Sequence, residues 1–231
     1  NMTLHASWLA GQCEAMLADE RLRVPAIGQG RGIVMDYSSP NVAKPMHVGH
    51  IRSTIIGDSL TRLLRFLGHR VVTDNHIGDW GTQFGMLIFG HKHLLDERSY
   101  AASPVGELAR LYKLVNSLSD GADLAEKLRR LPSDDPERRE IEQRWNAFQT
   151  HVRSLVSENP KVAGLAGRVP DAKSLARFVA EESRQETARL HSGDSENRAL
   201  WQSFMPHCLA ELDRVYDRLD IHFDHHFGES F

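Results

Sequence analysis

The chain has 231 residues, of which 41% are hydrophobic and 26% charged, and its 28 Lys and Arg against 31 Asp and Glu give a formal net charge of −3. This balance is typical of a globular protein with a hydrophobic core, and it excludes fibrous, collagen-like and low-complexity chains. Two cysteines, Cys13 and Cys208, are too few for a disulfide framework or a cysteine-based zinc site. We therefore expect a cytoplasmic protein without a membrane-spanning segment.

The N-terminal part of the chain predicts a helix followed by two strands. Thr3 is a candidate N-cap for a helix that runs to Glu20, inside an N-terminal helix and linker of residues 2–30. Short apolar runs with β-branched residues at 32–37 and 70–74 predict two buried strands.

Between these strands, isoleucines and leucines recur at spacings of three and four, which predicts an amphipathic helix that ends at Gly68. The stripe consists of Ile51, Ile55, Ile56, Leu60, Leu63, Leu64 and Leu67. A strand, helix and strand of about 40 residues has the size of a right-handed crossover between parallel strands. Residues 31–95 are therefore expected to be α/β, the first half of a Rossmann-like parallel sheet that binds a nucleotide.

Residues 96–220 have helical periodicity with prolines at its boundaries, and predict a large α-helical insertion. The expected helices cover about 104–118, 121–131, 136–157, 171–191 and 196–219. Apolar and polar side chains then alternate at 221–227, which predicts that residues 221–231 return toward the sheet as a strand. Since only two or three strands are available, we expect an incomplete sheet and hence a piece of a longer protein.

The loop between the first strand and its helix carries most of the polar chemistry. Pro40 and Pro45 fix φ and remove backbone donors, which favours a shaped loop. In an open α/β sheet, ligands bind beyond the carboxyl ends of the strands, where a helix N-terminus offers N–H groups to a phosphate. His47 and His50 lie at this terminus, and Gly49 lets a flat group such as adenine approach closely. The segment predicts an ATP site.

The two histidines also have structural explanations. A pair three residues apart can cap a helix, lie in a core, or supply half of a metal site. The sequence has no Glu or Cys nearby to complete a zinc set, and the loop gathers further polar side chains: Asp36, Ser38, Ser39, Asn41 and Lys44. Phosphate binding is therefore favoured over metal binding.

Three strings of residues are distinctive enough to suggest a family. The first runs from Ser38 through His47-Val-Gly-His50 to Asp58, the second covers residues 75–85, and the third is 215–220 followed by 228–231. The four-residue motif is similar to the His-Ile-Gly-His motif of class I aminoacyl-tRNA synthetases. The longer strings resemble arginyl-tRNA synthetases within that class, and the third looks like the family's return from its helical insertion.

The resemblance implies an arginine–tRNA ligase that works in protein translation. Arginine would attack the α-phosphate of ATP to give arginyl-adenylate and pyrophosphate, and the arginyl group would then pass to the terminal ribose of tRNA(Arg). Such chemistry depends on positioning and charge stabilisation more than on a covalent nucleophile. The implied partners are L-arginine, tRNA(Arg) and ATP with its Mg²⁺. We expect a monomer with no membrane partner and no protein-bound metal.

The same resemblance assigns roles to residues of the loop. The implied catalytic residues are His47, His50 and Lys44, and the implied ATP-binding residues are these three and Gly49. The implied arginine-binding residues are Asp36, Ser39, Asn41 and His50. Many family members have Glu at the position of Asp36, so its shorter side chain favours a contact through water. Lys44 is implied to assist where a later Lys-Met-Ser-Lys-Ser loop is weak or absent.

Other features are given structural interpretations. His222, Asp224 and His226 alternate along the last expected strand and could bind a metal, but we expect none. Trp80 and Gln83 lie in the family-like turn, and we favour a packing role for Trp80. An arginine cluster in the insertion alternates with acidic residues and favours a solvated surface over a tRNA contact: Arg129, Arg130, Arg138, Arg139 and Arg144.

Two alternative functions stay open at this point. The first is another ATP-dependent nucleotidyltransferase or ligase with the same His-x-Gly-His helix, acting on a small carboxylate without tRNA. The second is a non-catalytic piece that binds RNA or a protein partner through the helical insertion, although the net negative charge disfavours tight RNA binding. Under the main function, an arginine–tRNA ligase, we expect this chain to be inactive by itself.

Overall fold

The computed structural model describes residues 3–44 and 46–230, so the predictions for Pro45 and for the outermost residues of the ranges 2–30 and 221–231 lie outside the described residues. Contacts divide the chain into two compact units. The sheet unit consists of residues 1–39, 46–76 and 216–227, and the helical unit of residues 40–45, 77–215 and 228–231.

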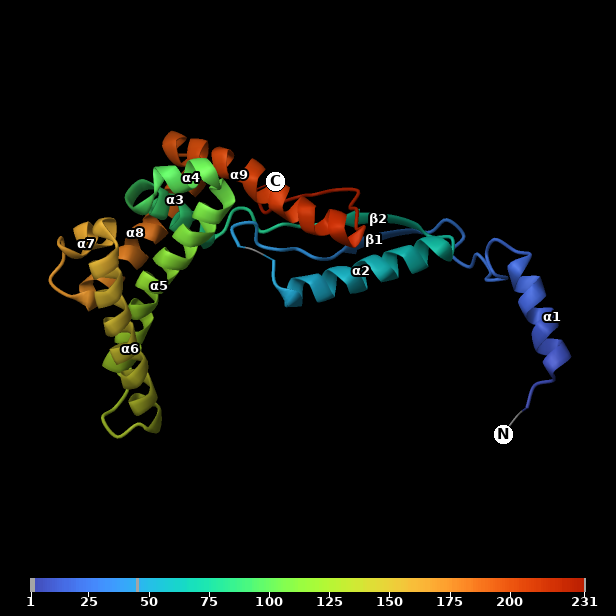
Figure 1. The fold of residues 1–231 in the computed structure, drawn as a ribbon, viewed down its shortest axis with the longest axis horizontal. Helices are drawn as coiled ribbons and strands as arrows, with labels where there is room; N and C mark the ends of the chain where they lie inside the picture. The colour runs from blue at the N-terminus through green and yellow to red at the C-terminus, as the bar shows by residue number, and fades with distance from the viewer. Residues whose placement is uncertain (1–2, 45, 231) are drawn as a thin grey trace. The chain divides into compact units, whose positions relative to one another are not determined.

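The sheet unit is built on two parallel strands. β1 (Gly32–Asp36) pairs with β2 (Arg70–Asp74), with Gly32 opposite Arg70, and α2 (Val48–Phe66) connects them (Figure 1). Gly68 follows α2 with a φ of +88°, as expected of a glycine that ends a helix. These elements confirm the predicted strand–helix–strand unit, and together with the helical part of the chain they confirm the α/β fold class.

α2 buries a different face from the one that its sequence predicted. Its buried residues are Thr54, Gly57 and Thr61, and a Cβ on Gly57 would lie 2.2 Å from the ring of Tyr37. The glycine therefore lets the helix lie directly against this tyrosine. The apolar members Ile55, Ile56, Leu60 and Leu63 are between 45% and 52% exposed. The periodicity predicted the helix correctly and its buried face wrongly, because spacing alone does not show which face meets the sheet.

Residues after the last helix lie alongside β2 without forming a strand. His225 makes an isolated parallel bridge to Asp74, in which its N–H donates to the Thr73 carbonyl and its own carbonyl accepts from Asn75, both at 3.0 Å. The Asp224 carboxylate accepts from the N–H of Thr73 at 2.8 Å and from its hydroxyl at 3.0 Å. Side-chain hydrogen bonds thus replace part of the ladder that the predicted strand would have made.

The N-terminal helix is shorter than predicted. α1 (Ala6–Leu17) begins after His5 rather than at Thr3, and none of its residues is buried. The segment that follows it is tied to the end of α2, because the N–H of Gly28 donates to the Leu67 carbonyl at 2.8 Å and that of Gly30 to the Gly68 carbonyl at 2.9 Å.

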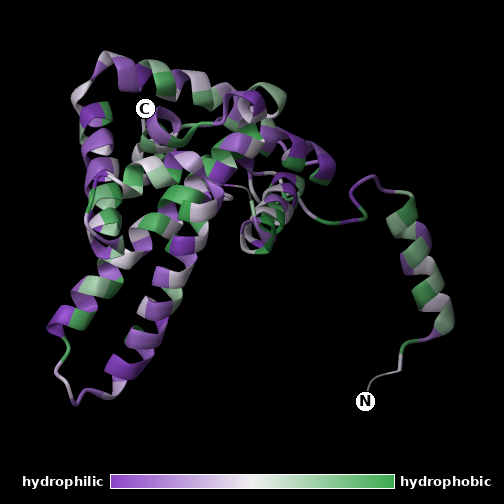
Figure 2. Cartoon of the chain, turned by 60° about the vertical axis from the view of Figure 1, so that its left-hand side comes forward, coloured by the Kyte–Doolittle hydropathy of each residue, from purple (hydrophilic) through white to green (hydrophobic). Residues whose placement is uncertain are grey.

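The helical unit has its own hydrophobic core. Its helices are α3 (Thr82–Leu94), α4 (Glu97–Ala102), α5 (Pro104–Arg130), α6 (Pro136–Glu158), α7 (Pro160–Ala166), α8 (Ala172–Ser192) and most of α9 (Ser195–Leu219). Fully buried core members come from several of these helices and include Phe89, Leu111, Ile141, Val162 and Leu175. α5 and α6 pack as a hairpin whose far end is mainly hydrophilic (Figures 1 and 2). Within the described residues, no helix combines the length and apolarity that crossing a bilayer requires.

One predicted break is absent and two short helices were missed. The expected helices over 104–118 and 121–131 form the single helix α5, because Gly121 serves close packing: a Cβ there would lie 2.2 Å from the ring of Phe148. α4 and α7 were not predicted, since short helices give little periodicity. Proline-marked boundaries were predicted well, as Pro136 and Pro160 occupy the first turns of α6 and α7.

Candidate active site

The first turn of α2 is formed by the two predicted histidines. His47 is the N-cap residue, and its ring Nδ1 accepts a hydrogen bond from the N–H of Gly49 at 3.1 Å. The ring Nδ1 of His50 accepts in return from the N–H of His47 at 3.3 Å, which completes a reciprocal cap. The two rings lie 3.9 Å apart between centroids, with 30° between their planes. The structural interpretation of the pair as a helix cap is therefore correct.

Capping does not exclude a role in phosphate binding. An Nδ1 atom that accepts a hydrogen bond carries no proton, so the geometry assigns the proton of each neutral ring to Nε2. The His47 ring can then cap the helix with Nδ1 and offer a donor at Nε2. The helix N-terminus adds a positive dipole end at the same place, which favours a bound anion.

Gly49 has a local reason to be glycine. A Cβ at this position would lie 2.9 Å from Cε1 and 3.0 Å from Nδ1 of His47. The absence of a side chain at Gly49 thus leaves room for the His47 ring in its capping position. An alanine here would displace that ring and weaken the cap.

Asp36 and Ser39 lie together at the end of β1. The Ser39 hydroxyl donates to the Asp36 carboxylate at 2.9 Å, and both residues are exposed. Ser38 and Ser39 have φ angles of +74° and +45°, so two successive non-glycine residues lie in the left-handed region. The Ser39 N–H donates to the side-chain oxygen of Asn75 at 3.1 Å. The sheet unit therefore brings together two of the predicted arginine-binding residues on a strained turn.

Asn41 and Lys44 belong to the helical unit. The side-chain oxygen of Asn41 accepts from the N–H of Ala43 at 3.1 Å, and its backbone forms an isolated parallel bridge with Gly78. The ammonium of Lys44 lies over the ring of Tyr112, 4.9 Å from its centroid, which is cation–π geometry. Tyr112 lies far along the chain in α5, so no local sequence pattern indicated this contact.

Three buried residues outside the predicted site form hydrogen bonds beside the turn that follows β1. The buried side chains of Thr54, Asn75 and Tyr216 are hydrogen-bonded to Ser38 or to one another. Asn75 and Tyr216 lie within the strings 75–85 and 215–220 that resemble the family. The strings therefore contained the signal, but nothing in the spacing indicated that these residues would meet.

The turn at residues 78–81 is held by aromatic packing in the helical unit. Trp80 stacks on His191, with 5.6 Å between ring centroids, and its ring meets the edge of Trp201 at 5.0 Å. The indole N–H of Trp201 donates to the Asp79 carbonyl at 2.7 Å. A Cβ on Gly81 would lie 2.6 Å from the side-chain oxygen of Gln83. The favoured packing role of Trp80 agrees with these contacts.

The alternating residues of the last segment have structural partners. Asp224 bonds to Thr73 and forms an ion pair with Arg65 at 2.9 Å, and the ring Nδ1 of His226 lies 3.3 Å from the side-chain nitrogen of Asn75. In the part of the chain that the structure describes, no group of three or more His, Cys, Asp or Glu residues is arranged to hold a metal ion.

Most of the arginine cluster of the insertion forms ion pairs along its own helices. Arg129 and Arg130 both pair with Glu126, at 2.6 Å and 2.7 Å, and the two guanidinium groups lower the pKa of that carboxyl to about 2. Arg138 pairs with Glu142 at 2.9 Å. These contacts favour the solvated-surface interpretation.

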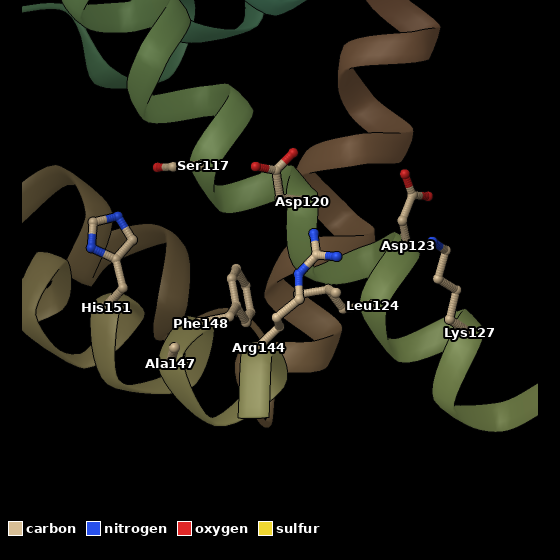
Figure 3. Close-up of a pocket in the computed structure, with 9 residues that line it drawn as sticks. All are labelled: Ser117, Asp120, Asp123, Leu124, Lys127, Arg144, Ala147, Phe148 and His151. Atoms are coloured by element: carbon tan, nitrogen blue, oxygen red, sulfur yellow. The ribbon is translucent and has the colours of Figure 1, made fainter. Parts of the chain in front are cut away.

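A cavity of about 560 Å³ lies between α5 and α6 (Figure 3). It is lined by Ser117, Asp120, Asp123, Leu124, Lys127, Arg144, Ala147, Phe148 and His151. Figure 3 shows Arg144 extending from α6 toward the aspartates of α5. Burial raises the pKa of Asp120, the charge of Asp123 raises it further, and Arg144 acts in the opposite direction. None of the predicted site residues lines this cavity.

Comparison with protein families gives one match over nearly the whole chain. Residues 12–231 match the family described as tRNA synthetases class I (R), catalytic domain.

Curated relatives from two bacteria agree with this match. An arginine–tRNA ligase of Rhodopirellula baltica is 41% identical over 262 residues, which cover 100% of this chain and 39% of the relative. One from Fusobacterium nucleatum is 37% identical and covers 86% of this chain and 26% of the relative. A solved arginyl-tRNA synthetase of Plasmodium falciparum is 27% identical, with a TM-score of 0.45, and covers 88% of this chain and 24% of that one. The chain thus spans well under half the length of these relatives.

Proposed function

Because the chain belongs to the family of class I tRNA synthetase (R) catalytic domains, we propose that it is part of an arginine–tRNA ligase. Membership of the family confirms the resemblance carried by residues 38–58 and 75–85. The activity, the substrates and the partners that follow are proposed for the longer protein, since this chain spans 39% of the Rhodopirellula baltica relative and 26% of the Fusobacterium nucleatum one.

The proposed reaction has two steps. The arginine carboxylate attacks the α-phosphate of ATP, a bond forms from its oxygen to phosphorus, and pyrophosphate leaves with its Mg²⁺. The 3′-terminal ribose of tRNA(Arg) then attacks the arginyl carbonyl, and AMP leaves. Neither step needs a covalent intermediate on a side chain, so the protein acts by orientation and by stabilising the charge that develops on the leaving groups.

The observation that carries the proposal is the family match combined with the geometry of the α2 N-terminus. His47 and His50 use Nδ1 in the cap, so the proton of each neutral ring is on Nε2, and Nε2 is the nitrogen that donates to phosphate oxygens in this proposal. In the proposal, these donors and the helix dipole stabilise negative charge on the departing pyrophosphate. Lys44 supplies a further cation, and Gly49, which has no side chain, lets the bound ATP lie close to the backbone.

Arginine binding is proposed at the end of β1. The exposed carboxylate of Asp36, held by the Ser39 hydroxyl at 2.9 Å, is suited to the ammonium or guanidinium of arginine. Asn41 and His50 complete the proposed set. The whole protein is proposed to act as a monomer in cytoplasmic translation.

The test is arginine-dependent ATP–pyrophosphate exchange, with and without tRNA(Arg). We would assay this chain beside a polypeptide that carries it together with the remaining length of the curated relatives. We expect exchange in the longer polypeptide, with arginine alone among the amino acids, and none in the 231-residue chain.

Other outcomes would separate the alternatives. Exchange with a different carboxylate and no effect of tRNA would replace the proposal with another nucleotidyltransferase. Binding of tRNA without any exchange in the longer polypeptide would replace it with a binding function.

A further inference from the structure

The hydroxyl of Tyr216 lies at the centre of a buried hydrogen-bond network in the sheet unit. It is 2.8 Å from the Ser38 hydroxyl, and the side-chain nitrogen of Asn75 donates to it at 3.0 Å. Tyr216 is 3% exposed and Asn75 is fully buried. Tyr216 lies near the end of α9, whereas Ser38 and Asn75 follow β1 and β2. One hydroxyl from late in the chain thus joins the two loops that follow the strands.

The network continues into the first turn of α2. The hydroxyls of Ser38 and Thr54 lie 2.8 Å apart, and the Thr54 hydroxyl donates to the backbone carbonyl of His50 at 2.7 Å. The Thr54 hydroxyl is thus within hydrogen-bond distance of both the Ser38 hydroxyl and the His50 carbonyl, and it shares its one proton between them. Asn75, Tyr216, Ser38 and Thr54 therefore form a continuous chain of hydrogen bonds that reaches the His50 carbonyl.

The other side of Asn75 fixes the strained turn. Its side-chain oxygen accepts from the N–H of Ser39 at 3.1 Å, and its nitrogen also lies 3.3 Å from Nδ1 of His226. Ser38 and Ser39 both have positive φ, at +74° and +45°. Backbone of this kind persists only where its surroundings hold it. Here the Tyr216 hydroxyl bonds to the Ser38 hydroxyl, and the side-chain oxygen of Asn75 accepts from the Ser39 N–H.

We propose that Tyr216 is a positioning residue for arginine, because its hydroxyl holds the Ser38–Ser39 turn and the carbonyl of His50 in one arrangement. The inference rests on the proposed function, in which Ser39 and His50 bind arginine. Tyr216 itself does not touch the substrate.

The chain offers a matched control for the tyrosine hydroxyl. Tyr37 packs on the same Phe223 ring as Tyr216, with centroid distances of 4.6 Å and 5.2 Å. Both tyrosines are buried, at 8% and 3% exposed. Within the described residues, the Tyr37 hydroxyl has no hydrogen bond of good geometry. Tyr216→Phe therefore removes a hydroxyl that belongs to the hydrogen-bond network. Tyr37→Phe removes a buried hydroxyl that does not belong to it.

The kinetic test uses the longer polypeptide in the exchange assay. Removal of a buried hydrogen bond that places the turn should raise the KM for arginine by about tenfold in Tyr216→Phe and leave it within about twofold in Tyr37→Phe. The KM for ATP should change less than the KM for arginine, which separates positioning of arginine from general loss of the fold.

A double-mutant cycle tests whether Tyr216 and Ser38 act on the KM for arginine through the same hydrogen bond. A general loss of stability would not make their effects on this KM non-additive. Ser38→Ala removes the hydroxyl that joins Tyr216 to Thr54, so it should raise the KM for arginine at least as much as Tyr216→Phe does, and the double variant should be no worse than Ser38→Ala alone. Additive effects, or lower thermal midpoints with an unchanged KM, would overturn the proposal.

A third measurement keeps the inference testable if the proposed function fails. Amide hydrogen exchange of the peptide that contains Ser39 should be faster in Tyr216→Phe than in Tyr37→Phe, because the turn is released. If the parent polypeptide has no arginine-dependent exchange activity, the proposed function fails and this comparison still shows whether Tyr216 holds the turn. If the parent is active and both tyrosine variants behave alike in both assays, the inference alone fails.

Discussion

Each histidine of the α2 N-terminus combines a structural and a proposed chemical role. His47 and His50 cap the helix reciprocally through Nδ1, so removing either ring disturbs local structure before any effect on phosphate binding is counted. A simple alanine substitution therefore cannot separate the two roles. Asparagine is among the best N-cap residues, and its side chain is shorter than imidazole. An asparagine at position 47 can therefore cap the helix without reaching the phosphate that the His47 ring is proposed to bind.

We predict that His47→Asn restores stability without restoring activity. His47→Ala should lower the free energy of unfolding by about 1 kcal/mol through loss of the cap, and His47→Asn should recover most of that loss. Both variants should reduce arginine-dependent exchange in the longer polypeptide by about a hundredfold or more, the usual cost of losing a donor to developing charge. Urea unfolding and initial exchange rates measure the two effects. Recovery of activity along with stability in His47→Asn would reduce the residue to a cap.

The sequence predicted where these residues lie better than what they contact. The prolines, the histidines and the following apolar periodicity predicted a loop and a helix start at His47, because these signals are local. The contact of Lys44 with Tyr112 and the network at Tyr216 join residues far apart in the chain. Such pairings depend on tertiary structure, so no local pattern could predict them.

At the scale of elements, glycines allow close contacts between helices and their neighbours. Gly121 of α5 meets Phe148 of α6 where a Cβ would come within 2.2 Å of the ring. Gly164 of α7 is helical too, but a Cβ there would have nothing within 4 Å. Both glycines are helical, but a Cβ has no room at Gly121 and open space at Gly164.

We predict opposite effects for alanine at these two glycines. Gly164→Ala should raise the free energy of unfolding by up to about 1 kcal/mol, because alanine favours the helix. Gly121→Ala should lower it by about 1–3 kcal/mol, because the buried Phe148 ring must move. Chemical denaturation of this chain measures both. Adding Phe148→Leu to Gly121→Ala should recover part of the loss, and a stabilised Gly121→Ala variant would contradict the close contact.

Asp224 links the last segment to β2 in a pH-dependent way. The N–H of Thr73, followed by its hydroxyl and the guanidinium of Arg65, holds the pKa of Asp224 below its ordinary value, although partial desolvation opposes them. Because the folded pKa is lower than the unfolded one, the ionised carboxylate stabilises the fold above the unfolded pKa, and the stabilisation is lost as the pH falls through the folded pKa.

We predict that Asp224→Asn destabilises the sheet unit near pH 7 and does so less in acid. The expected loss is about 1 kcal/mol at neutral pH, since the carboxylate is 45% exposed and solvent weakens the ion pair. The difference from the parent should shrink below about pH 4. Denaturation at several pH values measures it, with the exposed Asp217→Asn as the control. A difference that is constant with pH would contradict the role of the charge.

At the scale of the whole molecule, helix boundaries were easier to predict than the way that segments assemble. Prolines and caps marked the starts of α6 and α8 to within a residue, because these residues act on the adjacent turn. Assembly of the sheet unit from residues 1–39, 46–76 and 216–227 has no comparable signal. The alternation at 221–227 correctly predicted that this segment lies beside the sheet. It wrongly predicted a strand, because hydrogen bonds from the Asp224 side chain to Thr73 replace part of the backbone pairing.

Residues 216–227 are synthesised long after the rest of the sheet unit, which sets an order for folding during synthesis. The ribosome completes β1, α2 and β2 early, but Tyr216 and Asp224, which close their unit, emerge only after residues 77–215 of the helical unit. Helices that contact near neighbours in the chain fold quickly, so the helical unit has time to form first. Loop-closure entropy grows slowly with length, so the long detour costs little stability. Its cost is kinetic: until residues 216–227 emerge, the side of β2 and the Tyr37 ring that they contact stay uncovered on the nascent chain.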